Sequence, residues 1–284
     1  MTPLRQSMIE AMQLRGFSPR THESYLSAVE QLARHYHRSP DTLSLEELQG
    51  FFTHLVLERH LSPASCRLYL NGVRFFYLHV LGWQHFDVPL VVPKRVQRIP
   101  ELLTRAEIAR LLRATQNPKH RMLLGLCYGC GLRVSELVAV RVRDIDGERA
   151  QLRVEQGKGH KDRRVTISPH LLQRLRHYWQ AHHPVHWLFP SEQRPEQAIS
   201  ISCAQRVYGH AKRQAQIDKR GGIHALRHAY ATHQLENGLS VVRLKDELGH
   251  KDLHTTLRYL HWVPDSQRGQ GQDDLLAQLE VDDV

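Results

Sequence analysis

The chain has 284 residues, which is enough for one large domain or two of ordinary size. Its hydrophobic content of 41% and charged content of 24% are typical of a globular protein that buries a core. No apolar run approaches the roughly 18 residues that span a bilayer, and the N-terminus lacks a signal-peptide core, so we expect a cytoplasmic protein without a membrane partner. The formal net charge of +10 favours a polyanionic partner, although a basic protein without a nucleic-acid role has the same signature.

The first part of the chain has the pattern of a small all-α domain, residues 1–87. A first helix is predicted over about 2–15, and Ser18-Pro19 begins the second because proline suits the first turn of a helix. The third begins at Ser44-Leu45-Glu46-Glu47, a capping box in which serine and glutamate satisfy each other's backbone amides. Ser62-Pro63 begins the fourth helix.

A linker over 88–103 separates this domain from a second one, 104–269. The linker contains prolines and has no helical period; its basic residues suit a segment lying on phosphates, and a solvated linker fits equally well. A second capping box, Thr104-Arg105-Ala106-Glu107, begins the next domain. Helices are predicted over 105–140, and helical patterning returns from Pro169 to about Tyr259.

Between these helical stretches the sequence predicts a β-hairpin. Residues 151–155 and 163–167 alternate with period two, and Lys158 lies between two glycines at the turn. The C-terminal tail, 270–284, carries acidic and no basic residues and has the spacing of a short amphipathic helix. The fold class is therefore mainly α with a small β-hairpin or sheet (α+β), in two domains.

Two groups of metal-type side chains are not expected to bind metal. Cys127 and Cys130 form a CxxC inside an apolar stretch, with no second such pair, and are interpreted as small buried hydrophobic residues. His224, His228 and His233 are close in sequence, but no HExxH motif is present. The scattered cysteines also give no secreted disulfide framework.

The C-terminal half carries groups suited to attack on a phosphodiester. Such a reaction passes through a highly anionic pentavalent state, which fixed arginines stabilise well. Arg133 and Arg227 lie in apolar segments, where a charge needs a partner. His224 precedes Arg227 by three positions and shares its helix face. For any single arginine, a surface charge or a salt bridge remains the simpler interpretation.

Three further residues complete the candidate site. Tyr259 is a candidate nucleophile, although alone it equally fits a packed core tyrosine. His250, after a turn at Gly249, is a candidate partner for the phosphate or the phenol. A lysine on a hairpin turn can protonate a leaving oxygen, so Lys158 is a candidate acid, with a solvated turn as the alternative.

Together, these segments resemble the tyrosine recombinase (phage integrase) family, and in length its Xer-like or simple transposon- or integron-type members. Residues 130–137 are similar to the family's first arginine box and 157–163 to its lysine turn. Residues 224–233 resemble the HxxR box, and 248–259 the final histidine and nucleophile segment. Residues 1–87 are similar in pattern to the helical, SAM-like core-binding domain. Departures from the family pattern are a cysteine before the glycine of the first box and Ala-Tyr in place of Ser-Phe in the third.

The resemblance implies a site-specific DNA recombinase with six catalytic residues: Arg133, Lys158, His224, Arg227, His250 and the nucleophile Tyr259. The tyrosine would attack the scissile phosphate to give a 3′-phosphotyrosyl link and a free 5′-hydroxyl. The arginines would clamp the phosphate, the lysine would protonate the departing 5′ oxygen, and the histidines would assist proton transfer and phosphate binding. Because the covalent link conserves the energy of the bond, no cofactor and no metal is expected.

The resemblance also implies the partners. They are double-stranded DNA with specific recombination sites and further copies of the chain, monomeric or dimeric when free. A homotetramer on DNA would exchange strands through a Holliday junction, which places the protein at the nucleoid of a bacterial cytoplasm. The acidic tail would dock on a neighbouring subunit.

Two alternatives stay open. A type IB topoisomerase uses a similar tyrosine, arginines and lysine but relaxes supercoils without two sites, and the compact helical N-terminal domain favours the recombinase. A DNA-binding architectural protein without catalysis is the other alternative. It has no need for a phenol and a hairpin lysine, so the complete set of candidate groups weighs against it.

Overall fold

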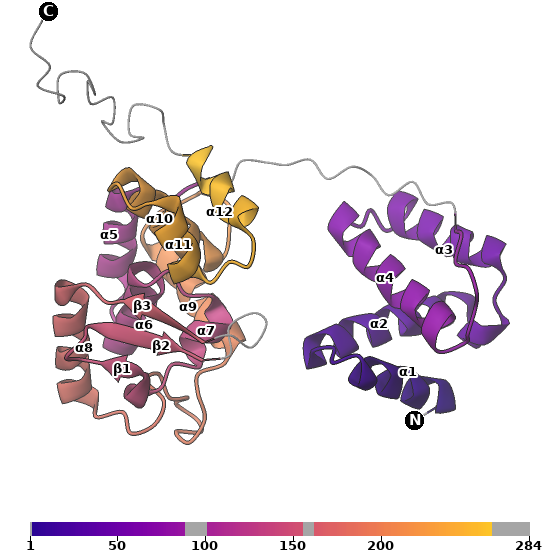
Figure 1. Ribbon diagram of the computed structural model, residues 1–284, viewed down its shortest axis with the longest axis horizontal. Coiled ribbons are helices and arrows are strands. Elements are labelled where there is room, and N and C mark those ends of the chain that lie inside the picture. The colour runs from indigo at the N-terminus through magenta and orange to yellow at the C-terminus, as the bar shows by residue number, and fades with distance from the viewer. Residues whose placement is uncertain (1, 89–100, 156–161, 263–284) are drawn as a thin grey trace, which may run out of the picture. The chain divides into compact units, whose positions relative to one another are not determined.

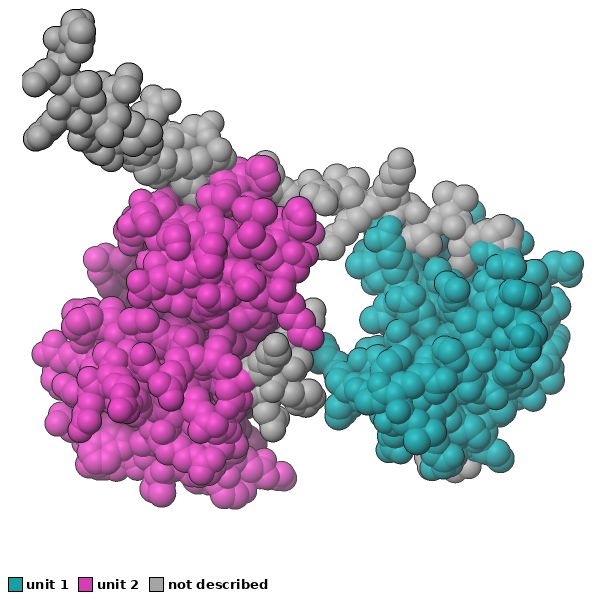
Figure 2. Space-filling view, in the orientation of Figure 1, with its two compact units in different colours: residues 1–98 teal, residues 99–284 magenta. Residues whose placement is uncertain are grey.

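The computed structural model describes residues 2–88, 101–155 and 162–262, which fall into two compact units (Figure 2). Unit 1 is Met1–Arg98 and unit 2 is Ile99–Val284. Lys158, the acidic tail and most of the expected linker lie outside the described residues. Within the described residues, no helix combines the length and the apolar character that crossing a membrane requires.

Unit 1 is a helical bundle in its described part (Figure 1). The Ser18 and Ser62 hydroxyls accept a backbone N–H in the first turns of their helices, and Ser44 and Glu47 form the predicted capping box. The four predicted helices are confirmed, with a 3-10 helix added between the second and third. The elements are α1 (Pro3–Leu14), α2 (Pro19–Tyr36), η1 (Pro40–Thr42), α3 (Leu45–Leu57) and α4 (Pro63–His79).

The core of unit 1 forms where α2 packs against α4 and the other helices cover them. Gly72 on α4 permits this approach, because an added Cβ would lie 3.1 Å from the Cα of Tyr25 on α2. Leu32, Phe51 and Phe76 are almost fully buried there. Burial of such side chains contributes about 1.5–3 kcal/mol each, so apolar packing holds this bundle.

Unit 2 combines helices with one small sheet (Figure 1). The region 105–140, predicted as helical, is helical with two interruptions, after Ala114 and after Gly129. The first break precedes Asn117, whose side chain caps the next helix. The helices are α5 (Arg105–Ala114), α6 (Pro118–Gly129), α7 (Val134–Val138), η2 (Val142–Asp144), α8 (Pro169–His182), α9 (Ile201–Gln214), α10 (His224–Glu236), α11 (Val241–Leu248) and α12 (Leu253–Leu260).

The sheet contains the predicted hairpin. Strands β2 (Gln151–Val154) and β3 (Arg163–Thr166) pair antiparallel, with Leu152 opposite Val165. Both of these side chains are fully buried, as period-two alternation requires for one face of a strand. A third strand, β1 (Ile145–Asp146), pairs antiparallel with β2 and was not predicted, because two residues are too few to show a period.

The helical prediction from Pro169 to about Tyr259 was wrong at 183–200 and at 215–223. Residues 183–200 are not helical and form an irregular segment between α8 and α9. Its backbone pairs with the chain after α7: the Val142 N–H donates to the His186 carbonyl at 3.0 Å and the Leu188 N–H to the Val140 carbonyl at 2.9 Å. The segment contains three prolines, which remove backbone donors and disfavour a continuous helix.

Helix α6 lies in the centre of unit 2 and packs against α8 and α10 (Figure 1). Cys127 and Cys130 at its end are fully buried in the main core, which confirms their interpretation as small hydrophobic residues. Burial raises the pKa of both thiols to about 12, so they stay protonated at neutral pH.

Candidate active site

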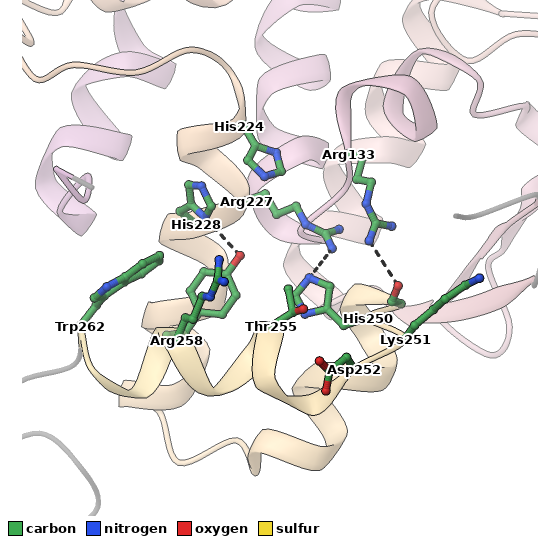
Figure 3. Close-up of a pocket in the computed structure, with 12 residues that line it drawn as sticks. Arg133, His224, Arg227, His228, His250, Lys251, Asp252, Thr255, Arg258 and Trp262 are labelled. Carbon is green, nitrogen blue, oxygen red and sulfur yellow. Dashed lines mark hydrogen bonds between the residues drawn. The ribbon is translucent and has the colours of Figure 1, made fainter. Parts of the chain in front are cut away.

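A pocket of about 420 Å³ in unit 2 collects most of the predicted site residues (Figure 3). Five of the six lie on its wall, from three separate segments of the chain, and Lys158 is outside the described residues. The pocket is lined by Arg133, His224, Arg227, His228, Gly249, His250, Lys251, Asp252, Thr255, Arg258, Tyr259 and Trp262.

Arg227 on the first turn of α10 is held rigidly at the base of the pocket. Its side chain is only 1% exposed and donates to the Gly131 carbonyl at 2.6 Å and to the Leu248 carbonyl at 2.7 Å. A third N–H points to Nε2 of His250 at 3.1 Å (Figure 3). Burial, followed by the charge of Arg133, lowers the pKa of Arg227 to about 10, so it remains charged at neutral pH.

Two glycine turns supply carbonyl groups to the arginines. Gly131 follows α6 with φ +58°, and an added Cβ would lie 2.4 Å from the ring of Tyr230, so only glycine fits. Gly249 ends α11 with φ +61° in the left-handed conformation common at helix C-termini. Its carbonyl accepts from Nη2 of Arg133 at 3.2 Å. The turns therefore fix both arginines through the backbone.

Glu136 on α7 is the carboxylate that gathers the arginines, and it was not predicted. It accepts from Nη1 of Arg133 at 2.7 Å and from both outer nitrogens of Arg163 at 2.8 Å each. Arg227 lies 3.9 Å away. Burial alone would raise the pKa of Glu136, but the hydrogen bonds and charge of Arg163, together with those of Arg133, hold it at about 2.

The charges at the base of the site do not cancel. Three guanidinium groups, those of Arg133, Arg163 and Arg227, surround the single carboxylate of Glu136. The cluster therefore carries a surplus of positive charge beside a pocket that two of these arginines line. A partly buried surplus of guanidinium charge is suited to an anion such as phosphate.

His250 is a neutral hydrogen-bond relay in this structure. Its Nε2 accepts from Arg227, so Nδ1 carries the proton and donates to the Thr256 hydroxyl at 2.8 Å. Burial, followed by the charges of Arg227 and Arg133, lowers the pKa of His250 to about 4, in agreement with this tautomer. Its ring is parallel to that of Tyr259, with centroids 6.2 Å apart.

Tyr259 lies in the last turn of α12 and is 4% exposed. Its hydroxyl is 3.1 Å from Nδ1 of His228 (Figure 3), so the phenol is hydrogen-bonded to this histidine while His250 contacts it by ring stacking. Burial raises the pKa of Tyr259, and the charges of Arg227 and Arg133 oppose the rise without cancelling it. The phenol is therefore protonated at neutral pH and able to donate to His228.

His224 opens α10 and, as predicted, shares a helix face with Arg227. Its ring is exposed toward the pocket and meets the ring of His228 edge-on, with centroids 4.5 Å apart. Desolvation on the protein side of the ring, followed by the charges of Arg227 and Arg133, lowers the pKa of His224. In the described parts of the chain, no three histidine, cysteine or acidic side chains are grouped so that they could hold a metal ion.

The sequence missed four residues that organise the site. Glu136 stands three positions after Arg133, a capping spacing that signals its backbone contact. His228 was considered only as a metal ligand. Arg163 and Trp262 carry no local signal, because their roles depend on contacts across the fold: Arg163 with Glu136, and Trp262 with the ring of Tyr259 at 5.2 Å.

Comparisons with known proteins identify the family of the chain. The model of the phage integrase family matches residues 101–265, and the model of its N-terminal SAM-like domain matches residues 4–85. The putative integrase/recombinase y4qK of Sinorhizobium fredii is 40% identical over 262 residues, covering 92% of this chain and 84% of that protein. Tyrosine recombinase XerD of Pseudomonas putida is 33% identical, covering 91% of this chain and 92% of that protein.

A solved structure shows the same fold. The lambda integrase(75-356) dimer bound to a COC′ core site has a TM-score of 0.71 with this chain at 20% identity, covering 90% of this chain and 92% of that chain. The family models together span both units, and relatives more than 30% identical match over most of their own length. The chain therefore belongs to the phage integrase family, the family of the tyrosine recombinases.

Proposed function

We propose that the chain is a site-specific DNA recombinase in which Tyr259 cuts and rejoins DNA strands through a 3′-phosphotyrosine. The observation that carries the proposal is one pocket that holds a protonated phenol beside two fixed arginines, Arg133 and Arg227. This arrangement offers a nucleophile and a phosphate clamp at the same place. Family membership supports the reaction type.

Cleavage begins when the phenol oxygen of Tyr259 attacks the phosphorus of a scissile phosphate. Negative charge builds up on the non-bridging oxygens in the transition state, and Arg133 and Arg227 donate to them. Because Glu136 and the backbone carbonyls already hold these guanidinium groups, little reorganisation is needed when the charge develops. His224, on the open side of the pocket, donates to the same phosphate.

The leaving 5′ oxygen takes a proton from Lys158, which the family resemblance assigns to this step. The phosphotyrosine keeps the energy of the broken phosphodiester, so a 5′-hydroxyl from a second strand reverses the reaction without ATP. No step requires a metal or a cofactor. His250 holds Arg227 in position by accepting at Nε2, because the hydrogen bond from Nδ1 to Thr256 fixes the tautomer of His250.

The partner is double-stranded DNA with specific sites, and the active assembly is a homotetramer that passes through a Holliday junction. Support comes from the net charge of +10 and from similar solved structures, such as the XerH site-specific recombinase bound to a palindromic difH substrate and the lambda integrase dimer on a core site. Acting on chromosomal DNA, the protein would work at the bacterial nucleoid. The acidic tail would dock on a neighbouring subunit.

Covalent trapping tests the proposal and identifies the site in one experiment. A pool of nicked duplexes with random sequence around the nick is incubated with the wild type, so that cleavage releases a short strand and traps the enzyme on the DNA. DNA that stays attached to protein under denaturing conditions is sequenced. Tyr259→Phe is the matched control, since it removes one oxygen and keeps the ring. Equal adduct with both proteins would refute the nucleophile, and no wild-type adduct would refute the function.

The same selected DNA separates the alternatives. A recombinase exchanges strands between two plasmids that carry the site, whereas a type IB topoisomerase relaxes a plasmid without it. An architectural binder shifts the DNA in a gel and forms no adduct. Junction products that depend on Tyr259 and on the site are expected.

A further inference from the structure

We propose that His228 is a catalytic residue of this site, the acceptor of the phenolic proton when Tyr259 attacks. The proposal rests on the proposed function, since it assigns a step in that reaction. The relevant atom pair is the Tyr259 hydroxyl and Nδ1 of His228, 3.1 Å apart (Figure 3). This distance lies within the range over which a general base takes a proton directly.

The tautomer of His228 suits this role. The protonated phenol of Tyr259 can donate its O–H to Nδ1 when the neutral ring of His228 carries its proton on Nε2, and we assign this tautomer to His228. The acceptor lone pair therefore already points at the proton that must leave. The rings also pack, with centroids 5.7 Å apart, and Trp262 contacts both from the end of α12.

The other groups beside the phenol are less able to take the proton. His250 stacks on the Tyr259 ring, but Arg227 occupies its Nε2 and Thr256 its Nδ1. Arg133 and Arg227 are charged and cannot accept a proton. His224 meets His228 edge-on and is exposed toward the pocket, where the phosphate would bind.

The surroundings of His228 link its basicity to DNA binding. In the free protein, burial, followed by His224 and Arg227, lowers the pKa of His228 to about 4, so it is a weak base. A phosphate between Arg133 and Arg227 would offset the positive charge of Arg227 that helps to lower the pKa of His228. The pKa of His228 would then rise, which favours the imidazolium. The base would then gain strength when the substrate is in place, and the nucleophile would stay inactive without DNA.

The step balances in atoms and charge. The phenol O–H bond breaks and its proton passes to Nδ1 of His228, giving an imidazolium, while the phenol oxygen forms a bond to phosphorus. The bond from phosphorus to the 5′ oxygen breaks, and that oxygen takes a proton from Lys158. In rejoining, the 5′-hydroxyl returns its proton to Lys158 and the imidazolium returns its proton to the departing phenol oxygen.

The test measures single-turnover cleavage of the DNA selected with the wild-type protein. His228→Asn keeps a hydrogen-bonding side chain near Nδ1 but cannot take a proton at neutral pH. General acid–base catalysis typically contributes about 10²–10⁴-fold, so we expect cleavage to fall by about a hundredfold or more. Gel-shift affinity for the same DNA should stay within about threefold. His228→Gln gives the same comparison if the asparagine impairs DNA binding.

A second measurement separates proton transfer from mere positioning. Tyr259 is replaced by 3,5-difluorotyrosine, whose phenol is more acidic and depends less on a base. We expect this change to raise the rate of His228→Asn about tenfold and to change the rate of the otherwise unmodified protein much less. An equal factor in both backgrounds would overturn the proposal, as would wild-type rates in His228→Asn.

A third measurement, with a modified substrate, excludes a role at the leaving group. A 5′-bridging sulfur leaves without needing a proton, so it should rescue Lys158→Ala and leave the His228→Asn defect in place. Rescue of His228→Asn would mean that His228 acts on the leaving oxygen, contrary to the proposal. If the wild type forms no adduct at all, the proposed function fails together with this step. Equal cleavage by wild type and His228→Asn refutes only the role of His228.

Discussion

Both outer nitrogens of Arg163 donate to the two carboxylate oxygens of Glu136 at 2.8 Å each, and the same carboxylate accepts from Arg133. The pair links β3, from the hairpin, to α7, from the first arginine box. Arg163 also donates to the Glu247 carbonyl at 2.8 Å and so reaches α11. A single buried carboxylate therefore ties three parts of the active site together.

Removing the charge of this carboxylate should be costly. Glu136→Gln keeps the shape of the side chain but leaves the surrounding arginines without their anion, and breaking a buried pair costs about 3–5 kcal/mol. We expect a loss of this size in urea unfolding and a large loss of cleavage. The matched control is Glu155→Gln, whose carboxylate pairs with Arg141 at 3.0 Å near the surface and should cost at most about 1 kcal/mol. Equal losses would contradict the role of Glu136.

Arg227 should not be replaceable by lysine. An ammonium cannot serve the Gly131 and Leu248 carbonyls together with the phosphate, so Arg227→Lys should reduce single-turnover cleavage by about 10²–10³-fold. An unsatisfied buried carbonyl should also cost about 1–3 kcal/mol of stability. Arg176→Lys is the control, because Arg176 donates to a carbonyl at an exposed site. Wild-type cleavage by Arg227→Lys would exclude the clamp.

Gly131 should tolerate alanine far less well than another left-handed glycine. Gly131→Ala adds the strain of a positive φ, which costs about 1–2 kcal/mol of stability. The added Cβ would also lie 2.4 Å from the Tyr230 ring, and overpacking of this kind costs about 1–3 kcal/mol more. Gly238→Ala carries only the strain, since nothing lies within 4 Å of its added Cβ. Thermal unfolding and cleavage measure the difference. Equal effects would mean that the contact with Tyr230 has no consequence.

Stability should fall in mild acid because two histidines of the site stay neutral in the folded state. The folded pKa of His228 and of His250 is lowered to about 4 from 6.5. Below pH 6.5 the unfolded chain binds protons that the folded chain excludes, so stability decreases from pH 6.5 toward pH 4. The upper limit is about 3 kcal/mol per histidine at 1.36 kcal/mol per pKa unit.

Urea unfolding between pH 7 and pH 4.5 measures this loss of stability. The window lies above the pH range in which carboxylates with ordinary pKa values bind most of their protons. His250→Asn should make the dependence on pH shallower without abolishing it, because the pKa values of His228 and His224 are lowered as well. His177→Asn changes an exposed residue of α8 and should leave the dependence of stability on pH unaltered. An unchanged slope in His250→Asn would show that this imidazole does not stay neutral on folding.

Local sequence patterns predicted many of the helices and the hairpin. The capping boxes at Ser44 and Thr104 mark the starts of α3 and α5, because a serine or threonine with a glutamate three positions later satisfies the first-turn amides without help from the rest of the chain. The hairpin followed from alternation. The irregular segment 183–200 was missed because its hydrogen bonds go to residues about 45 positions earlier, such as Val140 and Val142, and no local period records them.

The order of the motifs along the sequence predicted which residues belong to the site. Arg133, His224, Arg227, His250 and Tyr259 were identified from the sequence and line one pocket, although their separate roles remain proposals. The supporting contacts were not predictable. A carboxylate at position 136 looks the same in sequence whether it faces solvent or three arginines, and only packing distinguishes these cases.

The sequence by itself determined which residue types this protein brings to a phosphodiester and the helices and hairpin that carry them. These properties depend on side-chain chemistry and on contacts within a few residues. Only the tertiary structure decided which histidine meets the phenol and which carboxylate holds the arginines. His228 lies 31 positions before Tyr259, and Glu136 lies 27 before Arg163. Hydrogen bonds between such distant partners depend on how α7, α10, α12 and the sheet pack, which no local pattern specifies.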